Sequence, residues 1–213
     1  METIKSPAEQ KVTLHNVSWE TYERLMRERG ESRVPRFAYD RGELEIMSPQ
    51  AGHESISYAA ALLVEVLAEE MDIDVYGLGS TTFKREELQR GFEPDQCFYF
   101  GDWELVRGKE RLDLATDPPP ELVIEIDITS PSLNKLSIYA QLGVREVWRY
   151  DGERMRILGL EDAAYVERPT SLALPPLTND VLTRFAGEGA KLGRRAWMRE
   201  VREWARNRVG SSD

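Results

Sequence analysis

Residues 117–129 read DPPPELVIEIDIT, and this stretch indicates both the fold class and the candidate chemistry. Its three prolines cannot donate the hydrogen bonds of a β-ladder, so they mark a stiff break before a strand. The run from Glu121 to Thr129 is typical of a central strand, because it is rich in β-branched residues. It nevertheless contains Glu125 and Asp127. Because side chains alternate along a strand, Glu121, Glu125 and Asp127 share one face.

A second acid lies near the start of another predicted strand. Asp95 follows Pro94 and precedes the aromatic-rich residues 96–100. Buried carboxylates that converge repel one another, and a divalent cation is the usual compensation. We therefore expect Asp95 and Glu125 to bind Mg²⁺, or Mn²⁺ in its place, together with a backbone carbonyl near Ile126. The alternative is that these acids only form ordinary salt bridges.

A cation in this position suits the hydrolysis of phosphodiester bonds. The metal lowers the pKa of a bound water and offsets the negative charge that develops at phosphorus. A nearby lysine would orient the water or stabilise that charge. The acidic strand therefore predicts metal-dependent nuclease chemistry.

The rest of the chain predicts an α/β fold with a mixed β-sheet flanked by α-helices. Ser18 can cap a helix that extends to Arg29, and Gly30 is suited to end it. The other expected elements are a hairpin with arms at 36–39 and 43–47, a helix at 53–71, strands at 73–78 and 81–84, a polar loop or short helix at 102–116, a helix at 130–142, strands at 145–150 and 154–160, two further strand-like pieces and a C-terminal helix.

Composition narrows the class of protein. The 213 residues suffice for one well-buried core and are few for two. The single cysteine, Cys97, cannot form an internal disulfide, and His15 and His53 show no zinc-ligand spacing. Neither a signal peptide nor a run of about 18 apolar residues occurs, so we expect a cytoplasmic protein without a membrane partner. The net charge of −10 is unfavourable for binding a polyanion such as nucleic acid.

Several short motifs follow one another in a specific order. They are DRGELEIMSP at 40–49 followed by His53, Pro94-Asp95, PPPELVIEI at 118–126, SPS at 130–132, Lys135 with Tyr139, and GVREVW at 143–148. Together they resemble the Uma2 family of endonucleases, a branch of the PD-(D/E)XK restriction-endonuclease-like superfamily. The resemblance runs from about Ser18 to the hairpin after Asp151 and implies a restriction-endonuclease-like core.

The resemblance also implies roles for individual residues. Asp95 and Glu125 match the two metal-binding acids of the family. Glu43 matches an additional acid from the hairpin, and His53 matches the histidine after its Ser-Pro. The lysine of the superfamily should lie two residues beyond the glutamate, and this chain departs from the pattern with Asp127 at that position.

Lys135 is the expected substitute, because it matches the lysine of the family's Lys-x-x-x-Tyr pattern. It can reach the same volume only if its helix packs the side bearing Lys135, Tyr139 and Leu142 against the sheet. Otherwise Lys135 is a solvated cation near a helix start. Asp127 would be a third ligand, a partner of the lysine, or a change that abolishes activity.

His53 and Glu43 each have two interpretations. His53 stands near a helix N-terminus, where the dipole disfavours its protonated form, so it could act as a base or bind a phosphate oxygen. It could equally be a surface histidine that caps the helix. Glu43 either supports the acidic cluster or is an exposed hairpin residue.

The C-terminal segment is strongly basic. Residues 191–208 carry Lys191, Arg194, Arg195, Arg199, Arg202, Arg206 and Arg208. Opposite these charges, Trp197, Val201 and Trp204 form an apolar stripe that suits packing or a dimer interface. We divide the chain into an N-terminal extension (1–17), one restriction-endonuclease-like domain (18–190) and a C-terminal amphipathic basic helix with its tail (191–213).

We expect a homodimeric, Mg²⁺-dependent endonuclease that cleaves nucleic acid, with DNA as the substrate. Two other functions fit the same residues. One is a catalytically degenerate nuclease fold that binds without cleaving, which Asp127 and the acidic net charge favour. The other is a structural homodimer whose acids only form ion pairs.

Overall fold

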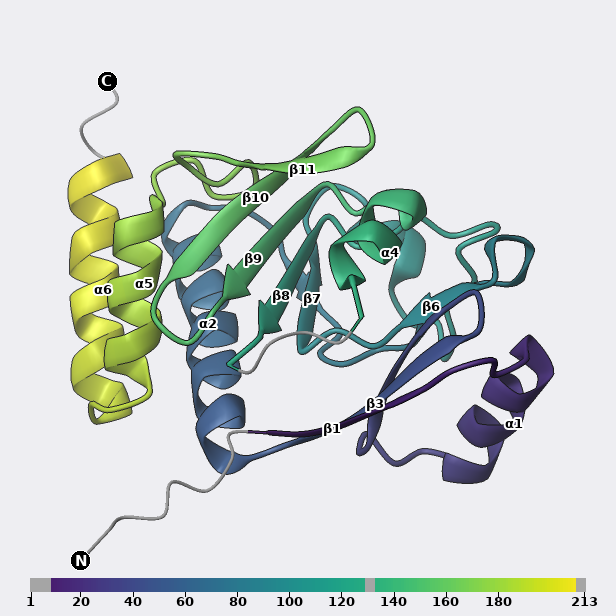
Figure 1. Cartoon of the computed structure of the whole chain (residues 1–213). Coiled ribbons are helices and arrows are strands. Elements are labelled where there is room, and N and C mark those ends of the chain that lie inside the picture. Colours follow the sequence, from purple (N-terminus) through teal and green to yellow (C-terminus); the bar gives the residue numbers. More distant parts are fainter. Residues whose placement is uncertain (1–8, 129–132, 210–213) are drawn as a thin grey trace, which may run out of the picture.

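The computed structural model of the chain describes residues 9–128 and 133–209 (Figure 1). It has the α/β architecture that the sequence predicts, but its strands form two β-sheets instead of the single mixed sheet that was expected. The SPS motif at 130–132, and the predicted start of a helix there, lie outside the described residues. None of the described helices is long and apolar enough to cross a bilayer.

The larger sheet contains the strand that carries Glu125. Its order is β11-β10-β9-β8-β7-β4. The strands are β4 (Tyr76–Gly77), β7 (Gln96–Tyr99), β8 (Leu122–Ile126), β9 (Glu146–Tyr150), β10 (Met155–Glu161) and β11 (Ala164–Glu167). β8 runs parallel to β9 and antiparallel to β7, so the sheet is mixed. Parallel neighbours need a crossover connection, and helix α4 (Lys135–Leu142) lies on the connection between β8 and β9.

The smaller sheet has the order β1-β3-β2-β6-β5. Its strands are β1 (Glu9–Leu14), β2 (Arg36–Asp40), β3 (Glu43–Pro49), β5 (Phe83–Arg85) and β6 (Arg90–Phe92). The predicted hairpin is β2–β3, and Gly42 in its turn has φ 101°, a backbone conformation that favours glycine. β1 and β6 were not expected from the sequence. β6 has only three residues with Gly91 at its centre, too few to show an alternating pattern.

Helix α1 (Trp19–Arg29) forms as predicted. The Ser18 hydroxyl accepts a 3.2 Å hydrogen bond from the Thr21 amide at its N-terminus, and Gly30 follows its last residue. Buried Tyr22 stacks on Tyr39 of β2, with ring centroids 4.9 Å apart, so α1 packs on the smaller sheet. Two short helical segments, 3-10 helix η1 (Glu86–Leu88) and α3 (Trp103–Val106), lie in connections.

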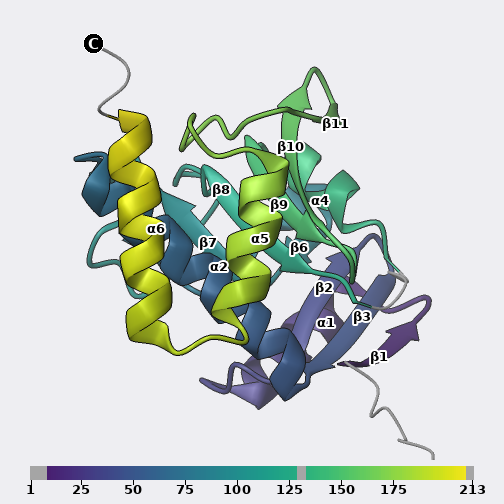
Figure 2. The same ribbon diagram turned by 90° about the vertical axis from the view of Figure 1, so that its left-hand side faces the viewer.

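Three helices lie on one side of the larger sheet (Figure 2). They are α2 (Ala51–Glu70), α5 (Asn179–Gly189) and α6 (Arg194–Val209). Helices α2 and α5 contact the strands, and α6 packs on these two helices. The sequence predicts two strand-like pieces before the C-terminal helix, but the structure has one strand, β11, and the helix α5. In α5 the buried residues Leu182, Phe185 and Ala186 recur at helical spacing, and the Thr178 side chain caps the N-terminus.

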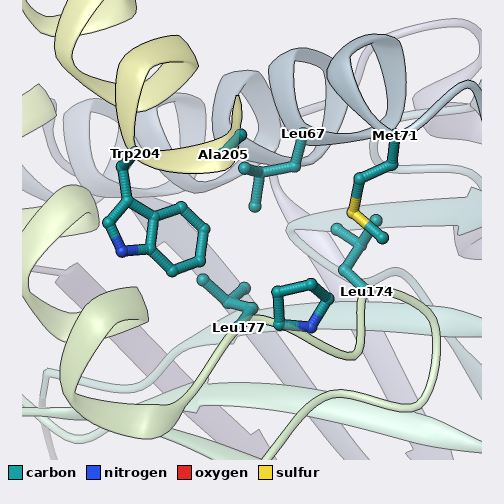
Figure 3. Close-up of a pocket in the computed structure, with 7 residues that line it drawn as sticks. Leu67, Met71, Leu174, Leu177, Trp204 and Ala205 are labelled. Carbon is teal, nitrogen blue, oxygen red and sulfur yellow. The ribbon is translucent and has the colours of Figure 1, made fainter. Parts of the chain in front are cut away.

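The apolar stripe of α6 packs inside the chain. Trp197 and Val201 are buried against α2 and α5, and the Trp197 indole donates a 2.9 Å hydrogen bond to the Phe185 carbonyl. Where α6 meets α2 and the loop before α5, apolar side chains enclose a niche with no room for a water molecule (Figure 3). Its lining carries no charged side chain, so we place no chemistry there.

Central strand β8 therefore lies between two helical layers. Leu122, Ile124 and Ile126 belong to the core formed with α2, α5 and α6. Val123 belongs to the opposite core, which includes Tyr139 of α4. Glu125 lies on the face of Val123, so its carboxylate is held on the α4 side, away from the large core.

Candidate active site

Glu125 is the central acid of the site. It is 2% exposed in the middle of β8. Lys135 Nζ donates a 2.8 Å hydrogen bond to its Oε2 atom, and the Tyr139 hydroxyl donates to its Oε1 atom. Lys135 and Tyr139 are four residues apart on α4, so they project from one side of that helix. Helix α4 thus packs Lys135, Tyr139 and Leu142 toward the sheet, as a helical lysine requires.

The protonation of Glu125 reflects its surroundings. Burial raises the pKa of Glu125 to about 7, and the nearby acids Asp95 and Asp127 act in the same direction while Lys135 opposes them. A carboxyl group with such a pKa exchanges its proton near neutral pH. Shifted carboxyl groups of this kind are concentrated at functional sites.

Lys135 also contacts an acid from the smaller sheet. Glu45 of β3 is 1% exposed, and its Oε1 atom lies 3.7 Å from Lys135 Nζ. Burial by itself lowers the pKa of Lys135, but the surrounding carboxylates, with Glu125 first, outweigh burial and raise it above its usual range. Lys135 is therefore a buried ammonium group that stays charged at neutral pH.

Asp95 lies opposite Glu125 in the sheet. Gln96 of β7 pairs with Ile124 of β8, and continuing this antiparallel register by one residue sets Asp95 across from Glu125. Asp95 is 1% exposed, and its Oδ2 atom accepts a 2.7 Å hydrogen bond from the Ile126 amide. The β-strand register thus brings the two predicted acids onto neighbouring positions.

Two further groups hold the Asp95 carboxylate. Arg36 of β2 donates to its Oδ1 atom, and Nε2 of His53 lies 3.2 Å from its Oδ2 atom. Burial raises the pKa of Asp95, but His53, Arg36 and Lys135 together outweigh it and hold the pKa below its usual range. Asp95 is therefore a buried, ionised acid.

Asp127 belongs to a different set of contacts. Its Oδ2 atom accepts a 2.9 Å hydrogen bond from Arg149 Nε, and its Oδ1 atom lies 3.5 Å from Lys11 Nζ of β1. Arg149 lies on β9, where it pairs with Glu125 in the parallel register. The position of the superfamily lysine is thus taken by an acid that holds two basic residues.

A cavity of about 230 Å³ opens beside these residues. Glu125, Asp127, Lys135, Tyr139 and Arg149 line it, together with Leu133, Asn134 and Leu136. Carboxylate oxygens, an ammonium group and a guanidinium group therefore border one volume large enough for a phosphate group and several waters. This cavity is where we place the chemistry.

The structure does not bring every predicted residue to this cavity, because Asp95, His53 and Glu43 are not among the residues that line it. Glu43 is the first residue of β3, next to the hairpin turn, where its half-exposed side chain contacts His15 Nδ1 at 2.5 Å. Glu45, two residues further on the same strand face, is the hairpin acid that reaches Lys135. His53 lies in the first turn of α2 and is fully buried against Asp95, so it is not a surface cap.

Four residues of this site were not predicted from the sequence. They are Lys11, Arg36, Glu45 and Arg149. Glu45 had a signal, because it shares a strand face with Glu43 in the same hairpin motif. Lys11, Arg36 and Arg149 had none, because a basic residue on a strand looks the same in sequence whether it meets solvent or a buried acid.

The donor chemistry fits Mg²⁺. This ion prefers oxygen ligands and is often held by one or two carboxylates, with water and substrate phosphate at the remaining positions. Within residues 9–128 and 133–209, no group of three His, Cys, Asp or Glu side chains is arranged to hold a metal. Asp95 and Glu125 would be such a pair of carboxylates, and a cation would compete with Lys135 for Glu125.

Comparison with known proteins identifies the family and a structure with a similar fold. The sequence matches the Uma2 family, described as putative restriction endonuclease, over residues 19–186. A crystal structure of a putative nuclease belonging to DUF820 from Anabaena variabilis ATCC 29413 is similar, with a TM-score of 0.53 and 15% sequence identity, over 80% of this chain and 99% of the other. At that identity the likeness concerns the fold alone. No curated protein matched the sequence.

Proposed function

The chain belongs to the Uma2 family of putative restriction endonucleases, and from this premise we propose that it is a Mg²⁺-dependent endonuclease that hydrolyses phosphodiester bonds of DNA. Family membership supports nuclease-like function. The dependence on a metal and the choice of DNA are our proposals. The observation that carries them is the buried Lys135–Glu125 pair at the cavity, with Asp95 opposite Glu125 in the sheet.

We assign the roles as follows. Asp95 and Glu125 would hold the cation, which when bound would polarise the phosphate and supply an activated water. Lys135 stays charged and stabilises the negative charge that develops on the phosphate. Tyr139 orients Glu125, and His53 orients Asp95. Glu43 has no role in this proposal, since it lies away from the cavity beside His15.

Substitution of Glu125 tests the proposal. Glu125→Ala should abolish Mg²⁺-dependent cleavage of plasmid or linear DNA while circular dichroism still reports a folded protein. Glu203→Ala, which removes an exposed acid of α6, is the matched control and should cleave like the wild type. If Glu125→Ala keeps full activity, the mechanism is wrong.

One observation favours a second candidate, a degenerate nuclease fold that binds nucleic acid without cleaving it. Asp95 and Glu125 already have basic partners in Arg36 and Lys135, so the protein can neutralise both acids without a metal. Titration calorimetry with Mg²⁺ and Mn²⁺ separates the candidates. The nuclease should bind metal in a Glu125-dependent way and gain thermal stability by mass action, and the degenerate or purely structural protein should not.

We also propose that the protein is a homodimer, so that each subunit cuts one strand of a duplex. Trp197 and Val201 of the α6 stripe are buried within one chain, so a dimer would have to use another surface. Analytical ultracentrifugation of the full chain tests this proposal. A single monomeric species at concentrations used for cleavage would contradict it.

A further inference from the structure

Arg149 is placed where a substrate phosphate would meet the site. It lies on β9 beside Glu125, and in parallel strands such neighbours project to the same face. Its side chain is 25% exposed and borders the cavity together with Lys135. A basic residue at a cavity wall is otherwise free to extend into solvent, so its placement needs an explanation.

Asp127 supplies that explanation. Its carboxylate is 5% exposed and accepts the 2.9 Å hydrogen bond from Arg149 Nε. The Asp127 amide donates a 2.8 Å hydrogen bond to the Tyr150 carbonyl, so the backbone of β8 is tied to β9 next to Arg149. A buried, fixed acid thus holds a more exposed guanidinium by one of its five N–H groups.

The remaining N–H groups of Arg149 form a fork. In the described part of the chain, Asp127 is the residue that accepts a hydrogen bond from Arg149, and it uses Nε. Among the described residues, no acceptor binds the Nη atoms, so a ligand could bind them. A guanidinium fork matches the geometry of phosphate oxygens and binds them in a bidentate way.

Lys11 adds a second positive charge at the same acid. Its ammonium nitrogen lies 3.5 Å from Asp127 Oδ1, while the other carboxylate oxygen, Oδ2, accepts the hydrogen bond from Arg149. Asp127 therefore collects one basic residue from β1 and one from β9. The single negative charge of Asp127 is thus accompanied by two positive charges.

From these contacts we propose that Arg149 forms a phosphate-binding subsite for the nucleic-acid backbone, with Asp127 as its positioning residue. The inference rests on the proposed function, because it takes the ligand to be nucleic acid. It places a non-scissile backbone phosphate on Arg149 while the scissile group lies by Glu125 and Lys135. Asp127 is then neither a metal ligand nor a defect of the motif.

The test measures binding without cleavage. A fluorescent duplex DNA is titrated with full-length protein in EDTA at several salt concentrations. Arg149→Gln should raise Kd roughly tenfold, and the slope of log Kd against log salt should fall by about 1, as for the loss of one phosphate contact. Arg145→Gln removes the same charge at a side chain that is 71% exposed at the other end of β9, and it serves as the matched control.

Asp127→Asn tests the positioning role by the sign of its effect. Removing a negative charge should by itself strengthen binding to DNA. If Asp127 holds Arg149 in place, Asp127→Asn instead weakens binding and lowers the salt slope, and it adds little in the Arg149→Gln background. Asp127→Glu keeps the charge and should restore part of the binding.

The outcomes separate this inference from the proposed function. Arg149-dependent binding in a protein that never cleaves supports the subsite and overturns only the nuclease proposal. Wild-type cleavage with unchanged Kd and slope in Arg149→Gln overturns the subsite alone. If Arg149→Gln does not fold, Arg149→Lys, which keeps the charge and loses the fork, takes its place and should weaken binding. Stronger binding by Asp127→Asn overturns the positioning role.

Discussion

Lys135 of α4 donates a 2.8 Å hydrogen bond to Glu125 of β8, although ten residues separate them along the chain. The strand position at which the superfamily places its lysine is occupied by Asp127, so the buried ammonium group comes from a helix instead. The contact is possible because α4 packs the side that carries Lys135 and Tyr139 against the sheet.

Replacement of Lys135 should greatly reduce cleavage while the protein still folds. Lys135→Met keeps the apolar stem and removes the charge, and we expect the cleavage rate to fall by roughly 100-fold or more, as for the loss of a charge-stabilising donor. Lys109→Met, at an exposed lysine paired with Asp117, is the control. Cleavage assays under single-turnover conditions measure the difference. Wild-type rates in Lys135→Met would contradict the role of this residue.

Removal of the Tyr139 hydroxyl should destabilise the protein more at high pH than at low pH. Tyr139→Phe removes the hydrogen bond to Glu125 and keeps the ring. This ring packs edge-on against Phe92, with ring centroids 4.6 Å apart. We expect a loss of about 1–3 kcal/mol at pH 8, where the acceptor is charged, and a smaller loss at pH 5.

Urea denaturation measures this loss. Tyr165→Phe, which removes a 2.6 Å hydrogen bond to the neutral Val144 carbonyl, is the control. It should cost about 0.5–1.5 kcal/mol at both pH values. Equal effects of pH on the two variants would show that Tyr139 does not sense the charge of Glu125.

The pKa of Glu125 makes stability depend on pH in a defined direction. On folding, the pKa of Glu125 rises from 4.5 to about 7, so the native protein binds more protons than the unfolded chain between these values. The stabilisation from the protonated carboxyl is complete below pH 4.5 and is lost as the pH rises through 7.

Glu125→Gln removes this dependence, because glutamine imitates the protonated form. In EDTA, the wild type should lose about 1–3 kcal/mol relative to Glu125→Gln between pH 5 and pH 8. Starting at pH 5 keeps Asp95 out of the comparison. Its pKa is lowered, so the stabilisation from its ionised carboxylate is lost only at more acidic pH. A constant difference between the two proteins over this range would contradict the shifted pKa.

The C-terminal helix should be part of the stable core. Trp197 is 1% exposed and donates a hydrogen bond to the Phe185 carbonyl, so Trp197→Ala should destabilise the chain by about 3–5 kcal/mol. Leu192→Ala, at an exposed position before α6, should stay within about 0.5 kcal/mol of the wild type. Urea unfolding curves compare the two. A small effect of Trp197→Ala would mean that α6 is an independent appendage.

Local sequence patterns were enough to predict the main helices and strands and several residues of the candidate site. Strand β8, the β2–β3 hairpin and helices α1 and α2 follow from apolar periodicity, a serine cap and a glycine turn. The acids Asp95 and Glu125 could be predicted because burying a carboxylate in an apolar strand costs free energy. Lys135 could be predicted because the motifs resemble those of a known family. These signals depend on residues that are close in the sequence, so they can be recognised without knowing how the helices and strands pack.

Only the tertiary structure decided which partner each acid receives. Arg36, Lys11 and Arg149 come from three different strands, and their contacts with Asp95 and Asp127 depend on sheet order and register. The same holds for Glu45, which reaches Lys135 while Glu43 does not. A sequence gives the spacing of side chains along one helix or strand, but the distance between two such elements depends on how they pack. That distance determines whether a buried carboxylate contacts a cation, a lysine or another acid.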